Sequence, residues 1–104
     1  MRKLTAVLAV VALLTAIGAV AAFGATKTVK WKVPTSSTVK IATGDSVKWV
    51  WSDGAPHNVS GPGFKSKTIA KQGFTYTHKF AKKGTFKIIC QVHPTTMKTT
   101  VKVG

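Results

Sequence analysis

The sequence predicts an all-β domain built as a sandwich of about seven short strands, with antiparallel pairing dominant. Apolar residues alternate with lysine and threonine over short runs, which is the period-two pattern of half-buried strands. Clusters of glycine, proline and aspartate separate these runs, and nothing after the first 25 residues shows the periodicity of an amphipathic helix. Short strands with frequent turns are typical of sandwiches.

The expected elements follow in chain order. Val29, Trp31 and Val33 alternate with lysines and predict a first strand whose apolar face points inward. Pro34 and residues 35–37 are expected to turn the chain before a short second strand at 39–41. The remaining expected segments are strands at 47–51, 74–80, 85–90 and 98–103, a brief strand start at 57–59, and an edge extended at 68–70.

Residues 1–25 are predicted to be a secretory signal that is cleaved at approximately this boundary. Residues 26–104 then form a single domain. Arg2 and Lys3 precede an apolar run at 4–17, and small residues at 19–21 suit a cleavage site. The alternative is an uncleaved membrane anchor. The only cysteine is Cys90, so a lipoprotein is not expected. The predicted location is outside the cytoplasm: periplasmic, at the cell surface, or secreted.

The charge is strongly positive, at +14 for the whole chain and about +12 without Arg2 and Lys3. Such a charge favours acidic protein partners and association with anionic cell-surface polymers. Nucleic acid is not expected as a partner, because the lysines alternate along strands and no nucleic-acid-binding motif is present. The alternative is that the lysines form a solubilising outer face.

The segment CQVHPTTM places Cys90, His93 and Met97 within eight residues, and His57 lies upstream in GAPHNV. A thiolate, two imidazoles and a weak thioether are the ligands of a blue copper site. A cysteine protease is the first alternative, because thiol nucleophiles need a nearby imidazole. Structural zinc would favour more thiolates than one, and a lone cysteine is often a small buried apolar residue.

Together with GDSVKWVW and PHNV, this segment resembles the cupredoxins, most closely the plastocyanin, halocyanin and amicyanin group, over about residues 26–103. The resemblance implies a Greek-key sandwich holding one type 1 copper ion. It implies His57 as the early ligand, Cys90, His93 and Met97 as loop ligands, and Asn58 as a residue that ties the two ligand loops together. Three residues separate His93 from Met97, against four in plastocyanins and two in amicyanins, which affects axial bond length, colour and potential.

The predicted function is one-electron transfer between redox partner proteins by a monomer that is not an enzyme. Only three histidines exist, so a trinuclear or type 2 copper centre has no ligands; His78, on a strand face, is given no ligand role. The alternatives are copper sequestration or delivery with the same ligands, and a basic polyanion-binding sandwich with a vestigial site. In this family the second histidine is the electron port, and the expected apolar patch around His93 contains Ala55, Pro56, Pro94, and Pro62 or Phe64.

Overall fold

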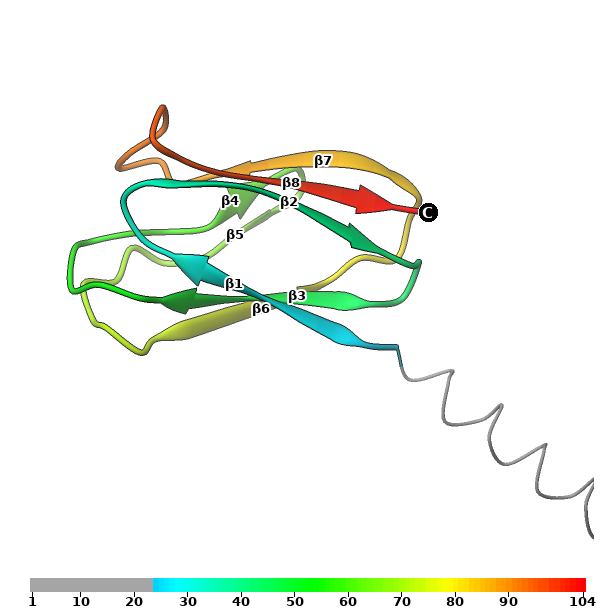
Figure 1. Ribbon diagram of the computed structural model, residues 1–104, viewed down its shortest axis with the longest axis horizontal. Helices are drawn as coiled ribbons and strands as arrows, with labels where there is room; N and C mark the ends of the chain where they lie inside the picture. Colours follow the sequence, from blue (N-terminus) through cyan, green and yellow to red (C-terminus); the bar gives the residue numbers. More distant parts are fainter. Residues whose placement is uncertain (1–23) are drawn as a thin grey trace, which may run out of the picture.

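The computed structural model describes residues 24–104, which form two β-sheets packed face to face (Figure 1). Almost all of the expected signal segment lies outside the described residues. No helix in the described part is long and apolar enough to cross a membrane. The strands are β1 (Thr26–Trp31), β2 (Thr35–Ile41), β3 (Ser46–Trp51), β4 (Ser60–Gly61), β5 (Phe64–Lys65), β6 (Thr75–Lys79), β7 (Gly84–Ile89) and β8 (Met97–Val103).

The smaller sheet has the order β1-β3-β6, and the larger sheet has the order β2-β8-β7-β4-β5. The predicted all-β sandwich is therefore confirmed. The β1–β3 and β2–β8 pairs are parallel, and the other four strand pairs are antiparallel. The described residues form eight strands, against about seven expected, because the chain around Gly61-Pro62-Gly63 forms a hairpin of two-residue strands.

The first turn differs from the prediction. Residues 35–37 belong to β2, where Thr35 pairs with Met97 of β8, and the turn instead occupies residues 32–34. Thr35 closes this turn, since its Oγ1 accepts a hydrogen bond from the Lys32 N–H at 3.1 Å. Val33 is consequently outside the strand and 42% exposed, so the inward orientation expected for it is wrong.

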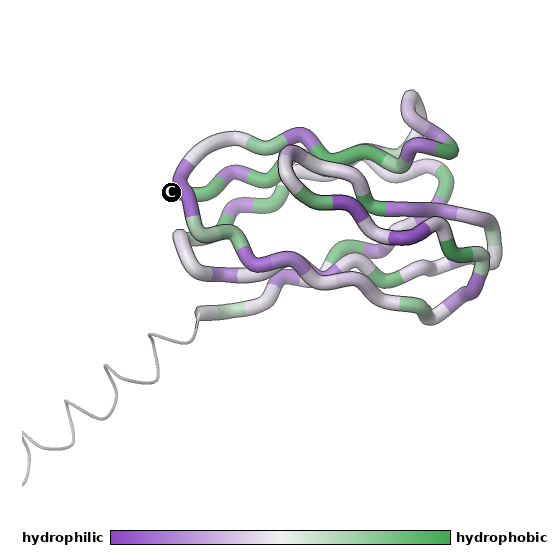
Figure 2. The backbone as a smooth tube through the Cα atoms, turned by 180° about the vertical axis from the view of Figure 1, so that it is seen from behind, coloured by the Kyte–Doolittle hydropathy of each residue, from purple (hydrophilic) through white to green (hydrophobic). Residues whose placement is uncertain are grey.

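The core lies between the sheets and consists of the inward residues of the alternating strands. Figure 2 shows hydrophobic and hydrophilic residues interleaved along the strands. Trp31, Trp49 and Trp51 are all fully buried, and full burial of a large apolar side chain contributes about 1.5–3 kcal/mol. Cys90 and Met97 belong to the same buried cluster. Two of the predicted ligands are therefore held by the core itself rather than by mobile surface loops.

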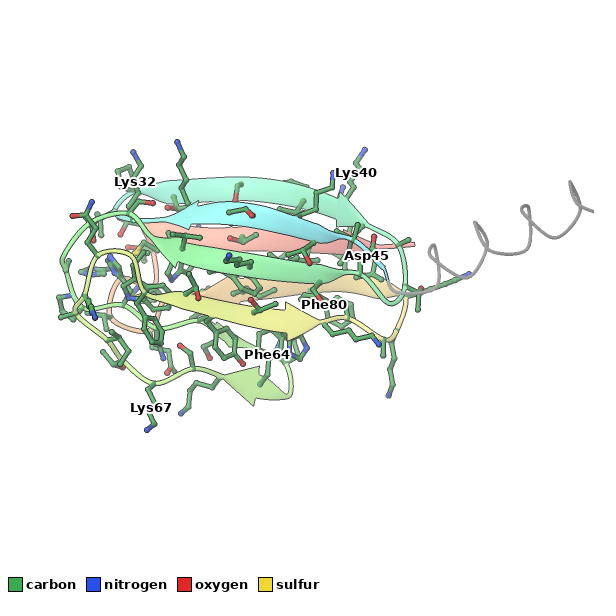
Figure 3. All side chains as sticks on the ribbon, turned by 90° about the horizontal axis from the view of Figure 1, so that it is seen from below. Lys32, Lys40, Asp45, Phe64, Lys67 and Phe80 are labelled. Carbon is green, nitrogen blue, oxygen red and sulfur yellow. The ribbon has the colours of Figure 1, made fainter. Side chains whose placement is uncertain are left out.

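The two ends of the sandwich differ in their loops. Figure 3 shows Lys32 and Lys67 toward one end and Lys40 and Asp45 toward the other. The loops that follow β3 and β7 lie at the first end, which we call the ligand end (Figure 1). The C-terminus, the turn at Gly44 and the start of β7 lie at the opposite end.

Between β5 and β6 the described chain forms no helix. Phe64 stacks on half-buried His78, with ring centroids 3.7 Å apart and planes 11° apart. Burial lowers the pKa of His78 below 6.5. Both rings line a cavity of about 330 Å³ with Pro62, Phe80 and Phe86. Phe64 therefore packs on His78 of β6 and not beside His93 as expected, and Pro62 lines the same cavity.

Candidate metal centre

His57 is held by backbone pairing with a segment twelve residues further along the chain. Its N–H and C=O both bond Ile69, at 3.0 and 2.9 Å. The indole N–H of Trp51 donates to the Ile69 carbonyl at 2.8 Å, so the end of β3 supports this bridge from the core side. The His57 side chain is completely buried, which fixes its ring against Trp51.

Asn58 connects the loop that carries His57 to the loop that carries Cys90. Its amide donates to Gln91 Oε1 at 2.8 Å, and its Oδ1 accepts the backbone N–H of Gln91 at 2.7 Å. The Asn58 carbonyl accepts the indole N–H of Trp31 at 3.0 Å. Buried polar groups that are paired in this way rigidify their surroundings, so the spacing between the two loops is fixed by hydrogen bonds on both sides of Asn58.

The loop from Cys90 to Met97 is closed by its own backbone. The Cys90 N–H donates to the Met97 carbonyl at 3.1 Å, and the His93 N–H donates to the Cys90 carbonyl at 3.2 Å. The His93 carbonyl in turn accepts the N–H groups of Thr96 and Met97, at 3.2 and 3.0 Å. The three residues between His93 and Met97 therefore form one compact turn, after which Met97 opens β8 with its side chain fully buried.

The predicted ligands approach one another from these two loops. Cys90 Sγ lies 4.0 Å from His57 Nδ1. A thiolate about 2.3 Å and an imidazole about 2.0 Å from one ion would be roughly 3.7 Å apart at a trigonal angle of about 120°. The rings of His57 and His93 meet edge to face with centroids 5.3 Å apart. Cys90 Sγ and His57 Nδ1 are thus close to the spacing of two ligands on one ion, and the His93 ring lies against the His57 ring.

Asp53 also lies beside the predicted ligands, a position that was not predicted from the sequence. Its Oδ1 lies 2.6 Å from Nε2 of His57, on the side of the ring away from Cys90. Burial would raise the pKa of Asp53, but hydrogen bonds from His57 and from the backbone of Val33 and Ala55 outweigh it and hold that pKa below 3.8. An aspartate four residues before a histidine across a Gly-Ala-Pro turn was the signal available in the sequence.

The residues present fit a copper ion. His93 Nε2 is buried and has no hydrogen-bond partner, the one such side-chain nitrogen or oxygen found among residues 24–104. A buried polar atom without a partner is costly, unless another group satisfies it. No three His, Cys, Asp or Glu side chains in this part of the chain form a closed metal cluster on their own. A thiolate, two imidazoles and a thioether nevertheless make the donor set that suits both copper oxidation states.

Comparison with known proteins gives consistent results. The family model "Copper binding proteins, plastocyanin/azurin family" matches residues 30–104. Amicyanin-alpha from Methylorubrum extorquens is 37% identical over 62 residues, which are 54% of this chain and 52% of the relative. The chain thus spans about half the length of this curated relative.

Two solved structures share the fold at low sequence identity. A purple cupredoxin from Nitrosopumilus maritimus has a TM-score of 0.58 at 27% identity, covering 64% of this chain and 77% of that chain. The Cu(I) form of an amicyanin mutant has a TM-score of 0.60 at 26% identity, covering 79% of this chain and 83% of that chain. The chain belongs to the plastocyanin/azurin family of copper-binding proteins, and its cofactor is one type 1 copper ion.

Proposed function

We propose that this protein carries single electrons between redox partners, with copper bound by His57, Cys90, His93 and Met97. The approach of Cys90 Sγ and His57 Nδ1 to 4.0 Å within the core carries this proposal. Copper supplies a one-electron Cu(II)/Cu(I) couple. The protein's contribution is rigidity, because donors held by core packing and hydrogen bonds undergo little rearrangement when the charge of the ion changes.

Each residue has a distinct role in this proposal. Cys90 supplies the thiolate, and its complete burial protects the sulfur from oxidation. His57 and His93 supply the equatorial imidazoles, and Met97 supplies the weak axial thioether. Asn58 keeps the two loops in register through its paired bonds to Gln91.

The proposed electron port is His93, which is half-buried while the other three proposed ligands are fully buried. Val33 and Val92, each 42% exposed, are the exposed large hydrophobic residues of the described chain. Val92 precedes His93, and Val33 is tied to the His57 loop through Asp53. With Ala55, Pro56 and Pro94, these residues define the apolar rim of the ligand end. Exposed apolar surface of this kind suits a short-lived protein contact.

The docking partner in this proposal has an acidic surface, and the carrier acts as a monomer outside the cytoplasm. Neither aspartate of the described chain has a lysine nitrogen within 4 Å, so most of the lysine charge has no close acidic partner. Lys32 and Lys98 are both exposed; Lys32 directly precedes Val33, and Lys98 directly follows Met97. Electrostatic attraction at such a rim speeds encounter more than it strengthens binding.

The copper assignment is tested by adding Cu(II) to the purified domain 26–104 and recording its visible spectrum. We expect an intense thiolate-to-copper absorption that disappears on reduction and returns on oxidation. Cys90→Ser should abolish the band, whereas Thr99→Ser, a buried change outside the proposed ligands, should retain it. A wild-type protein without the band, or a Cys90→Ser variant that keeps it, would contradict the proposal.

Electron carriage and copper delivery predict different behaviour of the loaded protein. A carrier exchanges electrons rapidly between its own Cu(I) and Cu(II) forms and retains its copper when mixed with a chelating acceptor peptide. A delivery protein loses its copper to that peptide. Slow self-exchange together with rapid copper loss would replace the carrier proposal with copper delivery.

The acidic-partner proposal is tested with two matched lysine pairs and an acidic redox protein as probe. Changing Lys32 and Lys98 to glutamate alters the ligand end, and changing Lys40 and Lys102 to glutamate alters the opposite end by the same charge. We expect the first variant to slow electron transfer more than tenfold at low salt and the second to have a much smaller effect. Equal effects would show that only net charge matters.

A further inference from the structure

We propose that Asp53 is a positioning residue that fixes the tautomer of His57 and biases the centre toward Cu(II). The inference rests on the copper site proposed above and extends it to a carboxylate that supplies no ligand. Three hydrogen bonds hold this carboxylate. Its Oδ1 faces His57 Nε2 at 2.6 Å and accepts the Ala55 N–H at 3.1 Å, while its Oδ2 accepts the Val33 N–H at 3.2 Å.

The first consequence concerns the proton on the His57 ring. A neutral imidazole carries one proton, and a carboxylate at 2.6 Å from Nε2 keeps the proton on that nitrogen. Nδ1 is then left with a lone pair, and this atom lies 4.0 Å from Cys90 Sγ. Asp53 therefore prepares His57 as a metal ligand before metal arrives, in the manner of carboxylate–histidine–metal triads.

The second consequence concerns charge. In the described chain, no lysine nitrogen lies within 4 Å of the Asp53 carboxylate, whose close side-chain partner is the His57 ring. The His57 side chain is fully buried, and Asp53 is about one-third exposed, at 35%. The negative charge of Asp53 acts on the ion across the buried His57 ring, where water screens it weakly. It therefore stabilises Cu(II) relative to Cu(I). Asp53 should therefore lower the reduction potential in a protein whose surface is otherwise strongly positive.

The chain offers a matched control. Asp45 is the other aspartate of this domain; it also accepts two backbone N–H groups, from Ala25 at 2.8 Å and Ala42 at 3.0 Å. It lies at the opposite end of the sandwich and contacts no histidine (Figure 3). Asp45→Asn and Asp53→Asn remove the same charge, so a difference between them reports the contact with His57.

Three measurements on the domain 26–104 test the inference: the ¹⁵N NMR tautomer of His57 in the metal-free protein, the affinity for Zn(II), and the copper reduction potential. For Asp53→Asn we expect the tautomer to persist, because the amide oxygen still accepts the Nε2 proton. The ratio of Cu(I) to Cu(II) affinity should rise about tenfold, which is about 59 mV for one electron. Asp53→Ala should mix the tautomers and weaken Zn(II) binding about tenfold. Asp45→Asn should change none of the three.

The inference is wrong if the Nδ1–H tautomer dominates in wild-type protein, or if Asp53→Asn and Asp45→Asn shift the potential equally. Thermal unfolding of each metal-free variant shows whether it folds. If Asp53→Ala does not fold, Asp53→Glu takes its place, and retention of the Nε2–H tautomer and of Zn(II) affinity then supports the inference while their loss contradicts it. The tautomer and Zn(II) measurements do not involve copper redox chemistry, so they distinguish failure of this inference from failure of the carrier proposal.

Discussion

The two aspartates of the domain lie at opposite ends of the sandwich and illustrate how those ends differ. Asp45 accepts N–H groups from Ala25 and Ala42, and these hydrogen bonds hold its pKa below 3.8. Asp53 also binds backbone groups, but in addition it contacts Nε2 of His57. One carboxylate completes a turn, whereas the other completes a turn and orients a candidate ligand.

The same contrast holds for the surrounding side chains. At the ligand end, His93 keeps a buried nitrogen without a partner, and two valines are exposed. At the opposite end, the turn at Gly44 is closed by ordinary backbone bonds, since the Gly44 and Phe80 N–H groups donate to Phe80 and Asp45 carbonyls. A buried polar atom without a partner lowers stability, and exposed apolar side chains contribute little to it, so the concentration of both at one end favours a functional role for that end.

The difference between the two ends should be largest for the effect of histidine substitutions on copper affinity. His57→Gln should weaken Cu(II) binding on the order of 10³-fold, because one donor of four accounts for roughly a quarter of the binding energy of a small metal site. His78→Gln should leave copper affinity unchanged, since His78 packs on Phe64 away from the site. Competition titration with a chelator measures both affinities. Equal losses would show that His57 acts through the fold and not as a ligand.

A smaller effect is expected where Asn58 joins the two loops. Asn58→Ala removes both side-chain bonds to Gln91 and should lower the unfolding free energy by about 1–2 kcal/mol in urea. Gln91→Ala removes only one of these bonds and should cost less. Gln72→Ala, an exposed glutamine, serves as the control and should have no effect. An Asn58→Ala variant as stable as wild type would mean that the ligand loops are held without this connection.

The smallest expected effect is on the pH dependence of stability, through His78, which lies away from the proposed ligands. Burial lowers the pKa of His78 below 6.5, so the unfolded chain takes up a proton before the folded protein does. The contribution of neutral His78 to the free energy of unfolding is complete above about pH 6.5. It is lost as the pH falls from there to the lower pKa of the folded protein. Lys79 and Lys82 are the lysines that line the same cavity.

Thermal unfolding of metal-free protein from about pH 7.5 to about pH 5 measures this loss, which after solvent screening should stay below about 1 kcal/mol. His78→Gln should make the slope shallower, while the Asp45 and Asp53 carboxylates titrate at lower pH and leave this window unaffected. A variant with the wild-type slope would assign the pH dependence to other groups.

Several features could be predicted from local sequence because they depend on residue type and spacing. The alternation at Val47, Trp49 and Trp51 predicted β3, and the same pattern around Tyr76 predicted β6. The inward residues of β3 are buried, and those of β6, Tyr76 and His78, are half-buried. The segment from Cys90 to Met97 pointed to copper because few other sites use its donors together.

Other predictions were wrong where contacts with residues distant in sequence determine the local structure. The threonines and serines at 35–37 suit a turn locally, yet their register with β8 makes them a strand. Val33 continues an alternating pattern, but its N–H is taken by Asp53 and its side chain stays outside. Phe64 was expected near His93, but β4–β5 pairing places it against His78 instead.

By itself, the sequence determined the class of fold, the positive charge and the kinds of donor available, because these follow from composition and period. Only the tertiary structure decided which atoms meet. His57 faces Cys90 with one nitrogen and Asp53 with the other because residues 53, 57, 69 and 90 come together through backbone pairing and burial. Such convergence depends on long-range contacts, and no local pattern encodes it.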